Sequence, residues 1–536
     1  VVLENLFRHV HEGGDKRTAI ILGTRDVCVA IFAATVITVV VFLPLGLTGG
    51  LIGEFFLPFG LAVTYALLSS FIVAITVVPV LAYLLLDVRE IGSEEESWLE
   101  RLYHPALHWA LDQSSHRWIV LAIAVLSLII GGALFATRPQ AFLPSFGQPQ
   151  ITVTINLPSS TKMPDTNTLV TQFEAWAKAN LPPDEVGVTQ TTIGGSGGLE
   201  SLILGSTSIS ENAAQVTIAV NDQSQLDALT ETVRAQAEQI FGKENVSVSG
   251  GTLSDQGFGG FELVLTGPQD ELEKLNSDVI STLDGVPGLT NVTSTLSQAA
   301  DAGGVTYNRI DQQSALSFTG ELETEDTLGV TAKAEDAIRA MPNLPSDVKV
   351  SEGFQSAQQT EGFASLGKAM VIAIVIVIVI LIITFRSLVH WLDIILSIIV
   401  APVGAAVLLT LTNRVLGISA LIGLLMLIGI VVTNAVVLID RVQSNQRERG
   451  MNTHDALIEA GNRRLRPILM TALATICALI PLAIGLSEGA IIASELGTVV
   501  IGGLFSSTVL TLLVVPVAYS LLDPLNKRLS GHKDQP

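Results

Sequence analysis

The sequence predicts a polytopic α-helical membrane protein with an inserted extracytoplasmic α+β domain. Hydrophobic residues make up 49% of the chain and charged residues only 15%, which is unlike an ordinary soluble protein. Eight apolar stretches reach the length of about 20 residues that a helix needs to cross a bilayer. The segment between Arg138 and Lys368 instead holds 29 acidic and 11 basic residues, against a net charge of −21 for the whole chain. This acidity argues against a nucleic acid partner and indicates a separate domain.

The apolar stretches set the order of the membrane elements. They lie at 27–46, 57–86, 118–136, 369–385, 392–412, 417–439, 467–486 and 496–522. They divide the chain into 1–26 (end of a truncated span and cytoplasmic loop), 27–96 (two spans and a cytoplasmic linker), 97–117 (interfacial helix), 118–137 (one span), 367–523 (five spans) and 524–536 (cytoplasmic tail). One alternating set of loops holds 17 Lys and Arg residues, whereas the short loops of the other set hold only Arg414. By the positive-inside rule the basic set is cytoplasmic, so the acidic domain is extracytoplasmic.

The stretch 97–117 differs from the spans because charged residues interrupt it. Trp98, Leu102 and Trp109 are interleaved with Glu100 and Arg101, which is typical of an amphipathic helix lying in the membrane interface. An ordinary connecting helix would show a similar pattern, so this alternative stays open.

Parts of the membrane sequence occur twice. Val1-Val2-Leu3-Glu4-Asn5 returns as Val436-Val437-Leu438-Ile439-Asp440, and the segment around Pro79 returns around Pro516. A repeat in the same order at a nearly fixed offset indicates a duplicated unit. Because residue 1 falls inside the first copy, we expect the chain to be the back part of a two-fold transporter.

The acidic domain has a different periodicity. Strand and helix patterns follow the order β-α-β-β-α-β in 138–258 and again in 259–366, which predicts two split-βαβ modules. In the first module we expect strands at 151–157, 187–193, 214–221 and 245–249, with helices at 164–180 and 224–241. In the second we expect strands at 261–266, 289–296, 305–319 and 347–352, with helices at 269–285 and 325–341.

The residues that usually carry enzyme chemistry do not form a recognisable site. Cys28 and Cys477 both lie in apolar runs, and the eight His are scattered, so neither a disulfide framework nor a metal-ligand spacing is present. A glycine-rich segment follows the second predicted strand and consists of Gly194, Gly195, Ser196, Gly197 and Gly198. It lacks the Lys-Ser/Thr of a phosphate-binding loop. It is either a linker or a loop that moves with substrate.

Four motifs resemble a known family of transporters. They are Val2-Leu3-Glu4-Asn5, Phe142-Leu143-Pro144, Thr433-Asn434-Ala435 and the run Arg464-Leu465-Arg466-Pro467-Ile468-Leu469-Met470-Thr471. Together with the two modules, they resemble the resistance-nodulation-division (RND) efflux transporters, in the acriflavine-resistance-like branch that exports hydrophobic and amphiphilic compounds. The resemblance covers essentially all 536 residues.

The resemblance implies a secondary active transporter of the plasma membrane rather than an enzyme. It implies a homotrimer that exports amphiphilic small molecules, contacts membrane lipids and uses the proton gradient without any cofactor. Two Asp of the family's fourth span would lie upstream of Val1; within the chain Asp393, Asp440 and Glu495 lie only at span ends. The expected partners of these acids are Thr433, Asn434, Thr471 and Arg464. Residues 194–198 correspond to the family's switch loop, and the two modules are its porter modules.

The sequence departs from the family pattern at two places. Thr433 replaces a Lys, and a hydroxyl can only form hydrogen bonds where an ammonium could exchange partners. For Thr433 and Asn434 a plain helix–helix hydrogen bond, of about 0.6 kcal/mol, is the alternative. The docking insert of the second porter module is reduced to the stretch 301–305. The reduced insert predicts a cell with one membrane and without an outer-membrane channel. Thr433 in place of Lys also resembles the Gram-positive-type branch of the family.

Other functions remain open at this point. A lipid exporter or a protein-translocation helper of the same superfamily would share this architecture. If the gene began at Val1, the chain could be an inactive truncated remnant.

Overall fold

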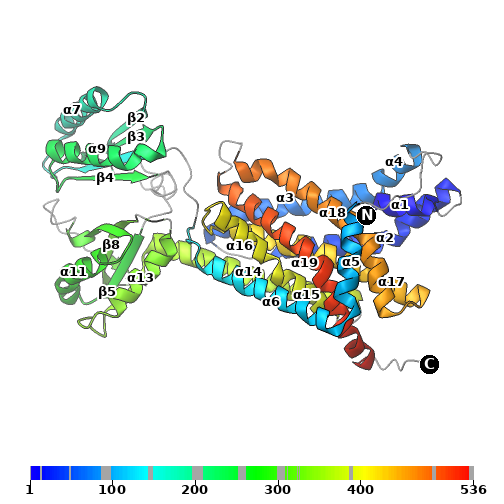
Figure 1. The fold of residues 1–536 in the computed structure, drawn as a ribbon. Helices are drawn as coiled ribbons and strands as arrows, with labels where there is room; N and C mark the ends of the chain where they lie inside the picture. Colours follow the sequence, from blue (N-terminus) through cyan, green and yellow to red (C-terminus); the bar gives the residue numbers. More distant parts are fainter. Residues whose placement is uncertain are drawn as a thin grey trace. The chain divides into compact units, whose positions relative to one another are not determined.

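A computed structural model describes most of the chain as two compact units. The described residues are 2–11, 15–46, 50–85, 98–142, 149–195, 209–251, 261–297, 308–310, 312–322, 324, 326–385, 390–485 and 491–529. One unit consists of Val1–Arg138 with Ala364–Pro536, and the other is Pro139–Phe363 (Figure 1). The sequence analysis placed the ends of the inserted domain at 138 and 366, close to this division.

The first unit is entirely helical in its described part. Its helices are α1 (Val2–His11), α2 (Lys16–Phe42), the short 3-10 helix η1 (Leu43–Gly46), α3 (Gly50–Ile75), α4 (Val77–Leu85), α5 (Trp98–Asp112), α6 (Ser114–Ala136), α14 (Phe354–Phe385), α15 (His390–Val400), α16 (Pro402–Leu411), α17 (Ile418–Arg449), α18 (Thr453–Ile484) and α19 (Ile491–Leu529). Eight helical segments of the described chain are long and apolar enough to cross a membrane. The predicted set of eight spans is therefore confirmed.

Several helices extend well beyond their apolar stretches. The connection expected at 440–466 is almost wholly helical, because α17 continues to Arg449 and α18 begins at Thr453. Gly450 ends α17 with a φ of 64°, and the Asn452 side chain accepts a hydrogen bond from the Asp455 backbone N–H at the start of α18. The interpretation of 440–466 as a loop was wrong. A fall in hydropathy shows where a helix becomes polar, but the helical hydrogen bonds can continue beyond that point.

Small residues allow the membrane helices to touch. Gly404 of α16 faces Gly502 of α19 so closely that a Cβ at Gly404 would lie 2.1 Å from the Gly502 carbonyl oxygen. Beside this contact the Ser506 hydroxyl donates to the Ala401 carbonyl (3.0 Å) and accepts from the Gly404 N–H (3.1 Å). Close backbone approach and interhelical hydrogen bonds are what hold helices together in lipid.

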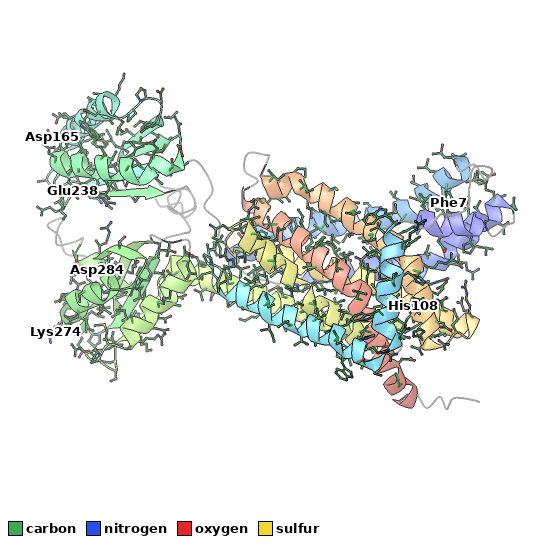
Figure 2. The ribbon with its side chains drawn as sticks, in the orientation of Figure 1. Phe7, His108, Asp165, Glu238, Lys274 and Asp284 are labelled. Atoms are coloured by element: carbon green, nitrogen blue, oxygen red, sulfur yellow. The ribbon has the colours of Figure 1, made fainter. Side chains whose placement is uncertain are left out.

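The second unit carries the acidic surface on its helices. Figure 2 labels Asp165 on α7 (Met163–Asn180) and Asp284 at the end of α11 (Gln269–Asp284), and both side chains are exposed. The negative charge of this unit is thus solvated, as expected for acidic residues outside a core.

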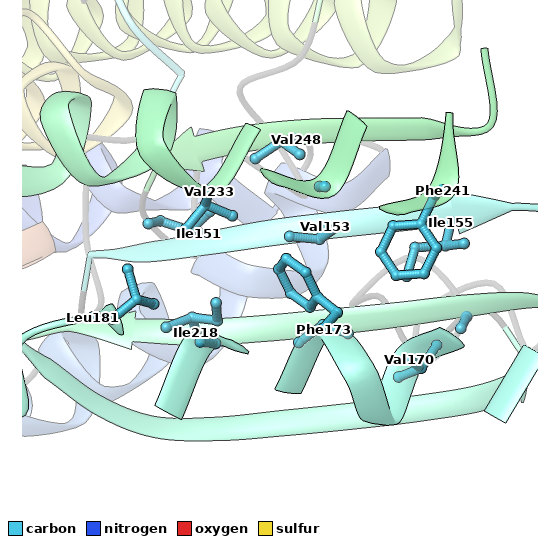
Figure 3. Packing of buried hydrophobic residues seen from close by; sticks show 14 of the residues in the cluster. Ile151, Val153, Ile155, Val170, Phe173, Leu181, Ile218, Val233, Phe241 and Val248 are labelled. Atoms are coloured by element: carbon cyan, nitrogen blue, oxygen red, sulfur yellow. The ribbon is translucent and has the colours of Figure 1, made fainter. Parts of the chain in front are cut away.

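The first module is a four-stranded antiparallel sheet with two helices. Its elements are β1 (Gln150–Asn156), α7, β2 (Val186–Gly195), β3 (Ile209–Val220), η3 (Gln223–Gln225), α9 (Leu226–Phe241) and β4 (Val246–Gly251), and the strand order is β2-β3-β1-β4. Ile151, Val153 and Ile155 alternate along β1 and are fully buried, together with Phe173 of α7 and Phe241 of α9 (Figure 3). The two phenyl rings lie 5.7 Å apart between their centroids. The predicted β-α-β-β-α-β order is confirmed.

The second module repeats this plan with one addition. Its elements are β5 (Phe261–Gly267), α11, β6 (Leu289–Ser294), β7 (Asn308–Ile310), β8 (Gln313–Leu322), α13 (Thr327–Arg339) and β9 (Lys349–Glu352), in the strand order β6-β8-β5-β9, with β7 paired to β8. The single strand predicted at 305–319 is wrong, because β7 and β8 form a hairpin in which Gln312 has a φ of 68°. Without a glycine to mark it, this turn left no signal in the sequence.

Candidate functional site

The predicted relay residues of α17 lie in the middle of the helical unit. Thr433 and Asn434 are half-buried, whereas their neighbours Val432 and Ala435 are fully buried. The Thr433 hydroxyl donates to the Ile430 carbonyl oxygen at 2.7 Å. In this state the hydroxyl is satisfied by its own helix, and it can exchange that bond for an approaching polar group.

The relay residues of α18 have a similar arrangement. The Thr471 hydroxyl donates to the Ile468 carbonyl oxygen at 3.0 Å, and its side chain is exposed in the described structure. One turn further on, the Thr475 hydroxyl donates to the Thr471 carbonyl oxygen at 2.9 Å. Arg464 is half-buried and lies near enough to Asp440 of α17 for their charges to interact.

Helices α17 and α18 contact each other within one or two residues of these polar groups. Leu427 and Val431 of α17, Ala472 of α18 and Leu504 of α19 form one buried cluster. Ala472 follows Thr471 directly, and Val431 lies two residues before Thr433. The hydroxyl groups of Thr433 and Thr471 each donate to a carbonyl oxygen of their own helix, so their proposed exchange of partners stays a prediction.

The sequence analysis missed a second polar group, which lies where α16 and α18 end and α19 begins. Arg414, between α16 and α17, donates to the Thr498 hydroxyl (2.7 Å) and to the Ala483 carbonyl oxygen (2.6 Å). Glu495 of α19 is only 2% exposed and interacts electrostatically with this guanidinium. Burial lowers the pKa of Arg414, and the charge of Glu495 partly offsets that effect. Two features of the sequence could have indicated this polar group. Arg414 is the only basic residue in its set of short loops, and Glu495 lies at the end of a span.

Another charged network joins α17 to α18 near their connection. Arg441, Arg449 and Arg463 lie 2.9, 3.4 and 3.5 Å from the carboxylate of Glu459. Asn445 donates a further hydrogen bond to this carboxylate. Arg441 and Arg449, two of the basic residues that predicted the orientation of the chain, therefore also connect α17 to α18, whereas the Arg463 pair lies within α18.

The predicted switch loop is described only at its start. Gly194 has a φ of 84°, and Gly195 pairs with Ile209 at the end of β2. Ser196, Gly197 and Gly198 lie outside the described residues. Among the described residues, no group of three or more His, Cys, Asp or Glu side chains is arranged to hold a metal ion.

Comparison with known proteins places this arrangement in a family. The AcrB/AcrD/AcrF family pattern matches residues 1–310 and 296–523. The swarming motility protein SwrC of Bacillus subtilis (strain 168) is 32% identical over 633 residues, covering 100% of this chain and 59% of the relative. The multidrug resistance protein MdtC of Erwinia tasmaniensis is 27% identical, covering 98% of this chain and 60% of the relative.

Solved structures agree with the fold. Crystal form I of a heavy metal efflux pump superposes with a TM-score of 0.72 at 20% identity, covering 94% of this chain and 59% of that one. Crystal form II gives the same TM-score at 19% identity.

These findings place the chain in the RND family of multi-pass membrane proteins. The chain belongs to the AcrB/AcrD/AcrF family and spans about 60% of the length of the relatives it matches.

Proposed function

We propose that this chain forms part of a pump that exports amphiphilic or hydrophobic compounds, such as drugs or lipopeptides, across the plasma membrane in exchange for protons. The observation that carries the proposal is the match of the family pattern over both the helical unit and the two split-βαβ modules. The name of MdtC as a multidrug resistance protein supports drug-like substrates. The likeness to a heavy metal pump is at 20% identity and supports the fold alone.

The proposed coupling uses hydroxyl and amide groups in place of a fixed ammonium. Thr433, Asn434 and Thr471 would form hydrogen bonds to the expected membrane carboxylates, and Arg464 would supply the positive charge. Helices α17 and α18 touch next to these residues, so a change at one helix is passed to the other by direct packing. A membrane carboxylate is costly to hold charged, which makes its proton state a suitable driver of movement.

Two further parts of the proposal concern assembly. The family pattern matches in two stretches that meet at 296–310, the place where the sequence analysis located the missing docking insert. The alignment with SwrC spans 633 positions although the chain has 536 residues, so that relative carries segments that this chain lacks. Our proposal of a pump without an outer-membrane channel rests on the short stretch at 301–305. We propose a homotrimer in contact with membrane lipids, with the modules extracytoplasmic.

The alternatives share the membrane architecture but predict different cargo. A lipid exporter or a protein-translocation helper would leave amphiphile efflux unchanged when the protein is removed. The two adjacent modules and the run 464–471 favour drug-type export over both. An inactive remnant would move none of these compounds.

The coupling can be tested with substitutions in the full-length protein that carries this chain. Thr471→Ala and Asn434→Ala should each reduce proton-dependent efflux of a fluorescent amphiphile by about ten-fold or more, as expected when about 1.4 kcal/mol of a coupling interaction is lost. Thr475→Ala is the matched control, because Thr475 lies one turn away and also bonds to its own helix. Efflux from cells and oligomer size after purification are the two measurements. Full efflux in both relay variants would remove these residues from the coupling.

A further inference from the structure

Helix α5 is attached to α18 along its whole length. Near its start, the Glu100 carboxylate lies 2.7 and 3.0 Å from two nitrogens of Arg466. In the middle, Tyr103 and Leu107 cover Gly461 so closely that a Cβ there would lie 2.8 and 2.7 Å from their side chains. The Tyr103 hydroxyl donates to the Leu512 carbonyl of α19 at 2.9 Å. These contacts pack the first half of α5 against α18 and α19.

The other end of α5 is held by a contact of different chemistry. Asp112, the last residue of α5, lies 3.1 Å from Nε2 of His454, the second residue of α18. Nδ1 of the same imidazole lies 3.4 Å from Asp455. His108 of α5 approaches Asp112 at 3.9 Å, and its ring lies 6.3 Å from that of His454 and 4.5 Å from that of His104. Figure 2 labels His108 on this helix.

The surroundings of His454 determine which way its charge acts. Two carboxylates, of Asp112 and Asp455, flank its ring, and the ring of His108 lies 6.3 Å away. From α19, Asp523 accepts a hydrogen bond from the adjacent Thr453 at 2.6 Å. When His454 carries a proton, its contact with the Asp112 carboxylate becomes an ion pair between two charged groups.

The two ends of the α5–α18 contact consequently respond differently to pH. The guanidinium of Arg466 keeps its charge throughout the physiological range, so its pair with Glu100 is permanent. Histidine changes charge between pH 5 and 8. His108 of α5 also faces His454 of α18, so a charge on both rings would oppose the contact, whereas a charge on His454 alone strengthens its pair with Asp112.

We propose that His108, Asp112, His454 and Asp455 form a pH-dependent latch that fastens the end of α5 to the start of α18 when the adjacent solution becomes mildly acidic. The latch acts on the helix that also carries Arg464 and Thr471. Its consequence for transport rests on the proposed function: protons delivered to the cytoplasm would tighten α5 on the relay helix and thereby signal a low cytoplasmic pH. The latch itself depends only on the contact described.

Hydrogen–deuterium exchange of the purified protein tests the latch without any transport. We compare peptides covering α5 and the start of α18 in the unaltered chain and in His454→Gln, always at the same pH so that intrinsic exchange rates cancel. Gln keeps a hydrogen bond to Asp112 but cannot gain charge. At pH 6 exchange in the unaltered chain should be about five-fold slower than in the variant, and at pH 8 the two should agree.

Two further variants make the result specific. Asp112→Asn should abolish the difference between pH 6 and pH 8 in the same way as His454→Gln. His9→Gln is the matched control, because His9 forms an equally short pair with Asp26 (3.0 Å) between α1 and α2, and it should leave α5 exchange unchanged. Two results would overturn the latch. One is that the unaltered chain and His454→Gln exchange at the same rate at both pH values. The other is that their exchange rates differ by the same factor at pH 6 and at pH 8. Because the readout needs no transport, this failure would leave the proposed export function intact.

Discussion

At the residue scale, the membrane unit is fixed by a small number of buried polar contacts. Arg414 connects three elements, because it bonds to Thr498 and to the Ala483 carbonyl and faces the buried Glu495. A charge without a partner in such a place is expensive, so each of these groups depends on the others. Thr433 and Thr471 differ, since each hydroxyl is satisfied within its own helix and is available to exchange.

The Arg414 contact predicts a characteristic pattern of stability. Arg414→Gln should lower the free energy of unfolding by about 3 kcal/mol, because it leaves Glu495 buried without its cation. Arg414→Lys should cost less, since it keeps the charge but cannot reach both hydrogen-bond partners. The double variant Arg414→Gln/Glu495→Gln should recover much of the loss. Denaturant unfolding of the purified protein measures all of these, and strictly additive effects of the two Gln substitutions would contradict a direct pair.

At the element scale, the strength of each sequence signal decided what could be predicted. Apolar length gave the eight spans, and alternation gave the strands around Val153, because burial imposes these patterns on every residue of an element. The hairpin at Gln312 and the helical continuation of α17 to Arg449 were missed, since backbone turns and caps depend on one or two residues. Thr433 and Thr471 were proposed as relay residues from motifs alone, and their role stays a prediction, whereas the partnership of Arg414 with Glu495 needed the three-dimensional packing.

The crossing of α16 and α19 predicts the effect of adding a single methyl group. Gly404→Ala would place a Cβ 2.1 Å from the Gly502 carbonyl oxygen, so the two helices must move apart and lose the Ser506 bonds. We expect a loss of about 2 kcal/mol in stability. Gly132→Ala in α6 is the matched control, because its added Cβ meets no atom within 4 Å. It should be neutral or slightly stabilising, as Ala favours a helix over Gly. Equal thermal stability of the two variants would contradict the crossing.

The junction between β9 and α14 predicts a pH-dependent stability. Burial raises the pKa of Glu352, and the charge of Glu335 adds to this, while a hydrogen bond from Thr360 (2.9 Å) opposes it. A carboxyl whose pKa is raised by folding destabilises the native state when it ionises. Glu352→Gln should therefore increase stability at pH 7, and this gain should disappear as the pH falls below the ordinary Glu value of about 4.3. Thermal unfolding across this pH range measures it, and a gain that persists at low pH would disagree.

At the scale of the whole molecule, the chain combines a membrane unit with a two-module acidic unit, the combination that places it among RND transporters. In the membrane unit, α17 and α18 pack side by side and carry the proposed relay residues, and α5 contacts α18. The modules have separate hydrophobic cores, one around Phe173 and one around Phe318, so each can keep its structure while other parts move. An exporter driven by protons needs both a proton-sensitive helix contact and domains that shift as bodies.

The most direct test of this account is whether substrate and protons move together. The full-length protein is reconstituted into liposomes that contain a pH-sensitive dye, and a pH gradient is imposed. We predict that adding a transported amphiphile accelerates the decay of the gradient, and that Thr471→Ala abolishes this acceleration while Thr475→Ala does not. Amphiphile transport that leaves the rate of proton movement unchanged would contradict the account.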